Sequence, residues 1–290
     1  MSFDDSEGLN WLFYGESGTG KTTLWSSFPG PILVMICSGG QKPGELRSIN
    51  TPEMRKKVQT VTLATPSEID DITRSLSPGG SHEGRFKTVV LDHVSGFQDL
   101  KLMSYKGLSS IPQQKTYGIA TQQDWGEITS QCKEHLVKLI SLPMNVVIIA
   151  QERIFTAKST DGEEKTSVIN AISLSEVIKP KVGAALVPSL TGWLNPACDY
   201  VVQTYKRPQI IKEPDIVKGK ETGTFTTRRG EAIEFCARTA PHDIFMTKFR
   251  VPGGAGLPES IVLGDTIKGV YTNPSGYERL MAIINSVRGQ

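Results

Sequence analysis

Hydrophobic runs of strand length alternate with amphipathic stretches along most of the chain. The pattern predicts strands at 11–14, 31–37, 58–64, 86–92 and 144–151. The continuous apolar run at 31–37 is typical of a buried parallel strand, because a strand covered on both faces shows no polar alternation. Helical periodicity or capping residues predict helices that begin near 22, 67, 123 and 276. This order predicts an α/β fold with a mainly parallel central sheet flanked by helices.

The second half of the chain changes character. Residues 199–205 predict one more strand, and residues 232–239 and 244–251 predict a late antiparallel pair joined around Pro241. The polar stretch 100–121 contains Gly107, Pro112 and Gly118, which predicts a loop excursion. We expect a core domain over 1–270 and a C-terminal helix within 271–290 that docks on it.

A phosphate-binding loop follows the first predicted strand. The pattern G-x-x-x-x-G-K-[ST] is matched by Gly15, Glu16, Ser17, Gly18, Thr19, Gly20, Lys21 and Thr22, with Thr23 next. Glycines let the backbone wrap closely around phosphates, and the following helix N-terminus favours negative charge. Lys21 is expected to reach the β- and γ-phosphates of ATP, and Thr22 to offer its hydroxyl to Mg²⁺.

Two later strands end in polar side chains that suit the same chemistry. The run 86–92 ends in Asp92, the form of a Walker B strand, whose carboxylate would hold Mg²⁺ directly or through water. His93 follows, either as a residue that positions water or as a capping histidine. Gln151 ends the next strand, where it could hydrogen-bond the γ-phosphate.

The composition of the chain excludes few classes of binding partner. A formal net charge of +2 does not argue for nucleic-acid binding by itself, so any such binding must come from local basic loops. The cysteines form no C-x-x-C pair and the histidines do not cluster, which predicts reduced thiols and no zinc site. With no signal pattern and no membrane-length apolar run, we expect a cytoplasmic protein with no membrane partner.

Basic residues alternate loosely with aromatic residues in the excursion. Lys101, Lys106 and Lys115 lie near Tyr105 and Tyr117, a combination that suits single-stranded nucleic acid, although an ordinary solvated loop explains it equally well. A second polar stretch after Gln151 contributes Arg153 and Lys158.

Four segments in order carry a family resemblance: GESGTGKTT at 15–23, VVLDHVSG at 89–96, NVVIIAQE at 145–152 and TKFRVPGG at 247–254. With them the chain resembles the phage-encoded RecA-like P-loop ATPases, the AAA-type nucleotide-binding proteins grouped with Sak-type recombinases. The resemblance implies an oligomer, ring or filament, with ATP at subunit interfaces. Lys248 and Arg250 would then contact a neighbour's γ-phosphate, and Gln151 would sense its own.

The same resemblance implies that residues 101–121 and 153–181 face single-stranded DNA, with Lys106, Lys115, Tyr117, Arg153 and Lys158 as candidate contacts. One departure concerns the catalytic base: Ser38 stands near the place where the family has a glutamate, so Glu45 or Glu152 would have to supply the carboxylate.

The implied function is an ATPase that promotes DNA annealing or strand exchange in phage recombination, in the host cytoplasm, with a single-strand binding protein as a further partner. A helicase-like or AAA-type motor or loader is the alternative, and a P-loop kinase is less favoured, because a kinase needs no basic pair from a neighbouring subunit.

Overall fold

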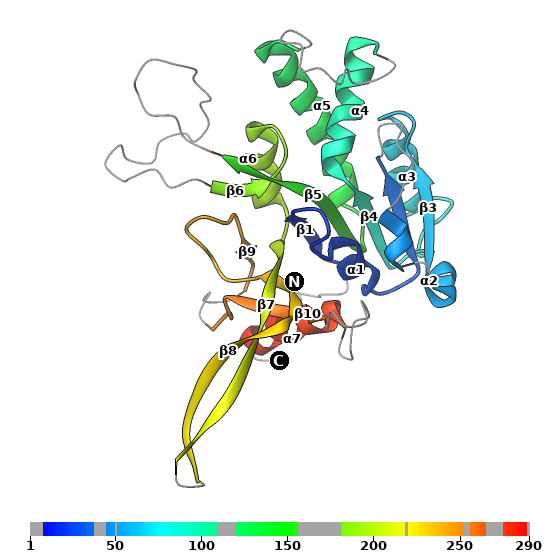
Figure 1. Cartoon of the computed structure of the whole chain (residues 1–290). Coiled ribbons are helices and arrows are strands. Elements are labelled where there is room, and N and C mark those ends of the chain that lie inside the picture. Colours follow the sequence, from blue (N-terminus) through cyan, green and yellow to red (C-terminus); the bar gives the residue numbers. More distant parts are fainter. Residues whose placement is uncertain are drawn as a thin grey trace, which may run out of the picture.

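The computed structural model describes residues 8–37, 45–49, 51–108, 120–155, 181–217, 220–251, 256–264 and 275–288 (Figure 1). The helices are α1 (Lys21–Ser26), η2 (Glu45–Ile49), α2 (Pro52–Lys57), α3 (Glu68–Leu76), α4 (Val94–Lys106), α5 (Gln122–Ile140), α6 (Pro188–Ala197) and α7 (Gly276–Arg288). The strands are β1 (Asn10–Gly15), β2 (Ile32–Ile36), β3 (Val58–Thr62), β4 (Thr88–Asp92), β5 (Asn145–Phe155), β6 (Lys181–Ala184), β7 (Tyr200–Val217), β8 (Lys220–Arg238), β9 (Lys248–Phe249) and β10 (Ser260–Gly264).

A single mixed sheet organises the molecule. Its strand order is β10-β8-β7-β1-β5-β4-β2-β3, with β6 paired to β5 and β9 paired to β7. The strands from β7 to β3 in this order run parallel to one another, whereas β8, β9 and β10 are antiparallel to their neighbours. This confirms the predicted α/β fold with a mainly parallel sheet, flanking helices and late antiparallel strands. The parallel strands end at one common edge, where ligands bind in such sheets.

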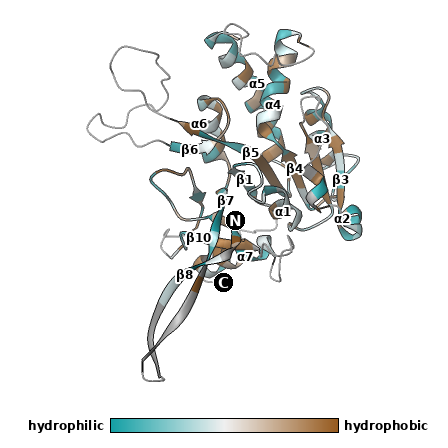
Figure 2. Cartoon of the chain, in the orientation of Figure 1, coloured by the Kyte–Doolittle hydropathy of each residue, from teal (hydrophilic) through white to brown (hydrophobic). Residues whose placement is uncertain are grey.

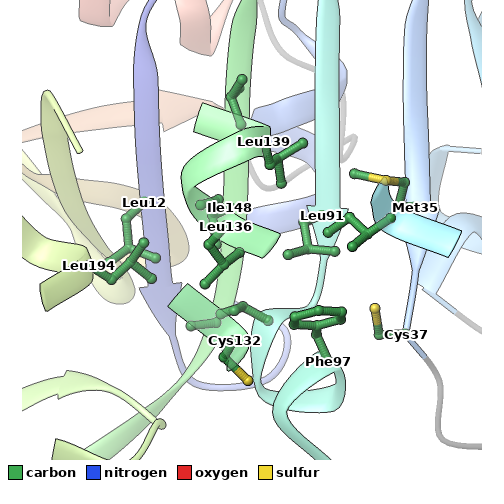
Figure 3. Packing of buried hydrophobic residues seen from close by; sticks show 14 of the residues in the cluster. Leu12, Met35, Cys37, Leu91, Phe97, Cys132, Leu136, Leu139, Ile148 and Leu194 are labelled. Atoms are coloured by element: carbon green, nitrogen blue, oxygen red, sulfur yellow. The ribbon is translucent and has the colours of Figure 1, made fainter. Parts of the chain in front are cut away.

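Each face of the sheet is covered by its own set of helices. Alternate residues of β1 show the division, because Leu12 and Tyr14 pack with α3, α4, α5 and α6, whereas Trp11 and Phe13 pack with α1 and α7. Figure 3 shows the first layer, with Leu136 and Leu139 of α5 over Ile148 of β5. Figure 2 shows the apolar middle strands against the polar α2 at the sheet's edge. Burial on both faces explains the continuous apolar runs.

The C-terminal helix docks where the hydrophobic pattern places it. Ser275 and Glu278 exchange backbone-to-side-chain hydrogen bonds at its start, a capping arrangement. The ring of Tyr277 packs 4.6 Å from that of Phe28, and Leu280 and Ile284 are fully buried. In the parts of the chain that the structure describes, no helix has the length and apolar character needed to cross a membrane.

The predicted late antiparallel pair is wrong. Residues 232–238 belong to β8, which pairs with β7 on one side and β10 on the other. From 244–251 only Lys248–Phe249 forms a strand, and it pairs with β7. The backbone groups ahead of it are used elsewhere: the amide of Ile244 donates to Nδ1 of His242, and the carbonyl of Ile244 accepts from the amide of Val182.

β7 and β8 form a long hairpin that the sequence did not predict. The two strands pair from Gln203↔Arg238 to Val217↔Lys220, and in Figure 1 the hairpin projects away from the sheet and its helices. Its register shifts at Pro208 and at Pro214, the two places where proline withholds a ladder hydrogen bond.

The predicted excursion at 100–121 is also partly wrong, because residues up to Lys106 belong to α4. Nδ1 of His93 accepts the amide of Gly96 and caps the helix start, and Gly107 ends the helix with a left-handed φ of 63°. Leu100 and Leu102 are buried on its inner side. Residues 109–119, the rest of the excursion, lie outside the described residues.

Candidate nucleotide-binding site

The loop between β1 and α1 has the backbone conformation of a phosphate cradle. Gly18 and Gly20 have φ values of 73° and 87°, in the left-handed region that favours glycine. Gly20 is also the N-cap of α1, so the first free amides of that helix adjoin the loop. Left-handed residues followed by a helix N-terminus form a concavity of amide donors that suits phosphate oxygens.

The loop is held against β7 at two points. A Cβ on Gly15 would lie 2.2 Å from the carbonyl oxygen of Thr204, so no other residue fits there without moving the backbone. The hydroxyl of Thr19 donates to the carbonyl of Glu16 and lies 2.8 Å from the hydroxyl of Thr204. Thr19 and Thr204 are both buried. The cradle is therefore fixed before any ligand arrives.

Lys21 points into this cradle. Its ammonium donates hydrogen bonds of 2.7 Å to the carbonyls of Gly15 and Glu16, and the residue is only 8% exposed. Burial lowers the pKa of Lys21 to about 8, while the carboxylates of Asp92, Glu152 and Glu16 act in the opposite direction. A lysine held this way can exchange the loop carbonyls for phosphate oxygens, which offer its charge a stronger partner.

Asp92 and Gln151 lie at the same edge of the sheet as the loop. Gln151 pairs in register with Gly15, and Asp92 pairs with Ile149 of the same strand β5. Asp92 is 8% exposed and close enough to Lys21 for its charge to raise the lysine pKa. The Thr22 hydroxyl and the Asp92 carboxylate are hard oxygen donors, which fit Mg²⁺. Among the described residues no group of three His, Cys, Asp or Glu could hold a metal.

Of the two carboxylates considered for the catalytic base, Glu152 is the one whose side chain the structure describes. Its Oε2 accepts a hydrogen bond of 2.8 Å from Gln203, and Gln203 in turn accepts one from Arg238. The Glu152 charge acts on Lys21. Glu45 begins η2, but its side chain lies outside the described part of the chain.

Comparison with known proteins identifies the family. Residues 7–233, well over half of the 290 residues, match the model of an AAA domain (AAA_24). The chain belongs to this AAA-domain family. Membership places it among the P-loop NTPases, and the matched residues include the loop, Asp92 and Gln151. No curated protein matches the sequence.

The AAA-domain protein is also similar to a solved structure, that of the flagellar accessory protein FlaH from Methanocaldococcus jannaschii. The two are 10% identical, the alignment covers 92% of this chain and 95% of that one, and the TM-score is 0.34. A likeness of this degree carries no information about function.

Lys248 and Arg250 lie at the end of the parallel strands opposite to the end that carries their own phosphate loop. β9 pairs with Tyr200 and Val201 at the start of β7, whereas the loop follows the end of β1. Both side chains reach the C-terminal end of α6, as expected if they share a face. Lys248 donates to the carbonyls of Asn195, Pro196 and Cys198, and Arg250 donates to the Pro196 carbonyl and to Asp199. In the single chain they cap a helix.

The candidate DNA contacts fall in three groups. Lys106, at the end of α4, forms an ion pair of 2.7 Å with Asp124, so its charge already has a partner. Arg153 is exposed at the end of β5 and lies over the ring of Phe155. Lys115, Tyr117 and Lys158 lie outside the described residues.

The sequence did not reveal the wall that β7 and β8 build beside the loop. Gln203, Thr204 and Phe235 lie in the strands predicted at 199–205 and 232–239, and Lys206 follows the first of them, but the pairing of these two strands was not predicted. A Cβ on Gly20 would lie 3.3 Å from the Phe235 ring, and one on Gly18 would lie 3.8 Å from the ammonium of Lys206. The sequence signal that could have extended the predicted strand past 205 is the alternation of Thr204 and Lys206 with Tyr205 and Arg207, which continues the strand period of two.

Proposed function

We propose that the AAA-domain protein is a magnesium-dependent ATPase that binds single-stranded DNA as an oligomer and serves DNA annealing or strand exchange. One observation supports the link between the two ligands. Strand β5 carries Gln151 beside the phosphate loop and, two residues later, the exposed cation Arg153 and Ile154, which is 62% exposed. Loss of the γ-phosphate at Gln151 could therefore shift Arg153 and Ile154, because only one or two residues of the same strand separate them.

The chain's own residues divide the work at the ATP site. The loop amides and Lys21 bind and orient the phosphates, and charge on the transferring group is stabilised there. Mg²⁺, when bound by Thr22 and Asp92, would neutralise part of the phosphate charge. In this proposal Gln151 contacts the terminal phosphate. Glu152 orients water, and its hydrogen bond from Gln203 supports that role by holding the carboxylate in place.

The position of the basic pair supports the proposed oligomer. Lys248 and Arg250 cannot reach their own loop from the opposite end of the parallel strands, so any role at ATP must be at a neighbour's site. Their contacts with α6 are the competing explanation, and a cap at a helix end needs no second subunit.

The decisive experiment measures size and DNA binding together. With a non-hydrolysable ATP analogue, we expect nucleotide-dependent oligomers that bind oligo-dT, and we expect Lys21→Ala to abolish both ATP turnover and assembly. Binding to oligo-dT should weaken with salt, because phosphate contacts release counterions. Arg153→Gln should flatten the slope of log affinity against log salt by about 0.7, the value for one single-strand phosphate.

The matched control is Lys87→Gln. Lys87 is an exposed cation just before the start of β4, at the opposite end of that strand from Asp92. It should leave the slope unchanged. A monomer that turns over ATP without binding oligo-dT would contradict the proposal and favour a kinase. Turnover coupled to duplex unwinding would favour the motor or loader class.

A further inference from the structure

A second lysine lies over the phosphate loop. Strand β7 runs parallel to β1 as far as Tyr14↔Gln203, and then continues past the loop. Lys206, three residues later, places its ammonium 3.8 Å from the position that a Cβ on Gly18 would occupy. Gly18 is one of the two left-handed glycines of the cradle, so this cation lies beside the phosphate loop itself.

Among the described residues the ammonium of Lys206 has no polar partner. No hydrogen bond or ion pair joins its side chain to any residue in the described ranges, and the side chain is exposed. Its neighbour Arg207 differs, because it forms an ion pair of 3.0 Å with Glu234 across the hairpin. Lys21, the other loop cation, is surrounded by carboxylates.

The root of the hairpin holds Lys206 in this place. Lys206 pairs in register with Phe235, whose ring lies against Gly20, and Thr204 on the same face contacts Thr19. Directly paired and alternate residues share one face of a sheet, so all three side chains face the loop. The position of the ammonium is therefore set by backbone pairing rather than by the reach of a flexible side chain alone.

We propose that Lys206 binds the β- and γ-phosphates of the nucleotide held by its own chain, as a second cation beside Lys21. This inference rests on the proposed ATPase function. A nucleoside triphosphate brings several negative charges to a cradle whose cation Lys21 already faces Asp92, Glu152 and Glu16. Lys206 supplies the positive charge that balances the terminal phosphates, and it leaves the base and ribose untouched.

Calorimetric titration of Lys206→Met tests this with ATPγS, ADP, AMP and adenosine. A charge-assisted hydrogen bond is worth enough to weaken ATPγS binding about tenfold or more. ADP should weaken less, and AMP and adenosine should keep their wild-type affinities. Lys206→Arg should restore most of the loss, because it keeps the charge.

The matched control is Arg229→Met, which removes an exposed cation from the same hairpin. Arg229 pairs with Ile210, four residues beyond Lys206 and so roughly 13 Å further along the strand. It should bind every ligand as the wild type does.

Three results would overturn the inference. ATPγS affinity within twofold of the wild type would remove Lys206 from the site. An equal loss for adenosine would mean that the substitution disturbs the fold of the site, and an equal effect of Arg229→Met would mean that only net charge matters. If the wild-type protein binds none of the four ligands, the proposed function fails as well, whereas a fully active Lys206→Met variant refutes this inference alone.

Discussion

Raising the pH from 7 to 9 should weaken ATP binding through Lys21. Burial lowers the pKa of this lysine to about 8 from an ordinary value of 10.5. In the free protein the ammonium therefore loses its proton as the pH passes 8. Bound phosphates add negative charge beside Nζ and raise its pKa again, so binding requires the protonated form.

The size of the effect follows from these two pKa values. If phosphates restore the ordinary value, Lys21 is charged in both states at pH 7 and about nine-tenths neutral in the free protein at pH 9. At pH 9, one unit above this pKa, only about one free molecule in ten carries the protonated lysine that binding requires. The affinity for ATP should therefore fall about tenfold between pH 7 and 9. The terminal phosphate does not confuse the measurement, since a phosphate monoester has a second pKa of about 6.

Calorimetry can measure both the affinity and the proton. At pH 9 binding should take up close to one proton, seen as a difference in heat between two buffers of unequal ionisation enthalpy. Lys21→Arg stays charged throughout and should show neither the uptake nor the loss, whatever its affinity. An unchanged wild-type affinity from pH 7 to 9, with the circular dichroism spectrum intact, would refute the assigned burial and pKa of Lys21.

Two further predictions test other contacts. Gly96→Ala should destabilise the fold by about 2 kcal/mol and lower Tm by roughly 4–8 °C, because a Cβ there would lie 2.1 Å from the carbonyl oxygen of Cys37. The control Gly126→Ala in α5 has open space around it and should not lower Tm. Equal Tm values for the two variants would contradict this reason. Arg250→Ala and Lys21→Ala subunits should each be inactive and should regain part of their turnover when mixed, if Arg250 serves a neighbour's ATP. Co-assembled mixtures that stay inactive would leave Arg250 with only its contacts to α6.

The parallel core was predictable from sequence because its signals are local. Apolar runs at 31–37 and 144–151 became β2 and β5, and the loop pattern fixed what must follow β1. The pairing of β5 with β1 then brings Gln151 beside Gly15, while its role at the γ-phosphate stays a prediction. The expectation that Lys248 and Arg250 share a face also agrees with their common contacts at α6.

The parts that sequence missed depend on partners far along the chain. Pro208 and Pro214 argue against a strand, yet the hairpin accommodates both at its register shifts. Helix α4 contains Gly96 and ends at Gly107, and its inner residues become apolar contacts only once α5 lies beside it. The place of Lys206 depends on β7 lying next to β1, which no local pattern encodes.

The β7–β8 hairpin is a long arm whose root contacts the phosphate loop. Its root contacts Gly15 and Thr19 through Thr204, and Gly20 through Phe235. From Thr204 at the root to Val217 at its end, β7 spans about 43 Å at the usual rise per residue. A tilt of about two degrees at the root would move the tip of such an arm by about 1.5 Å. A partner that holds the tip of the arm would therefore act on the cradle through Thr204 and Phe235, the same residues that contact the loop.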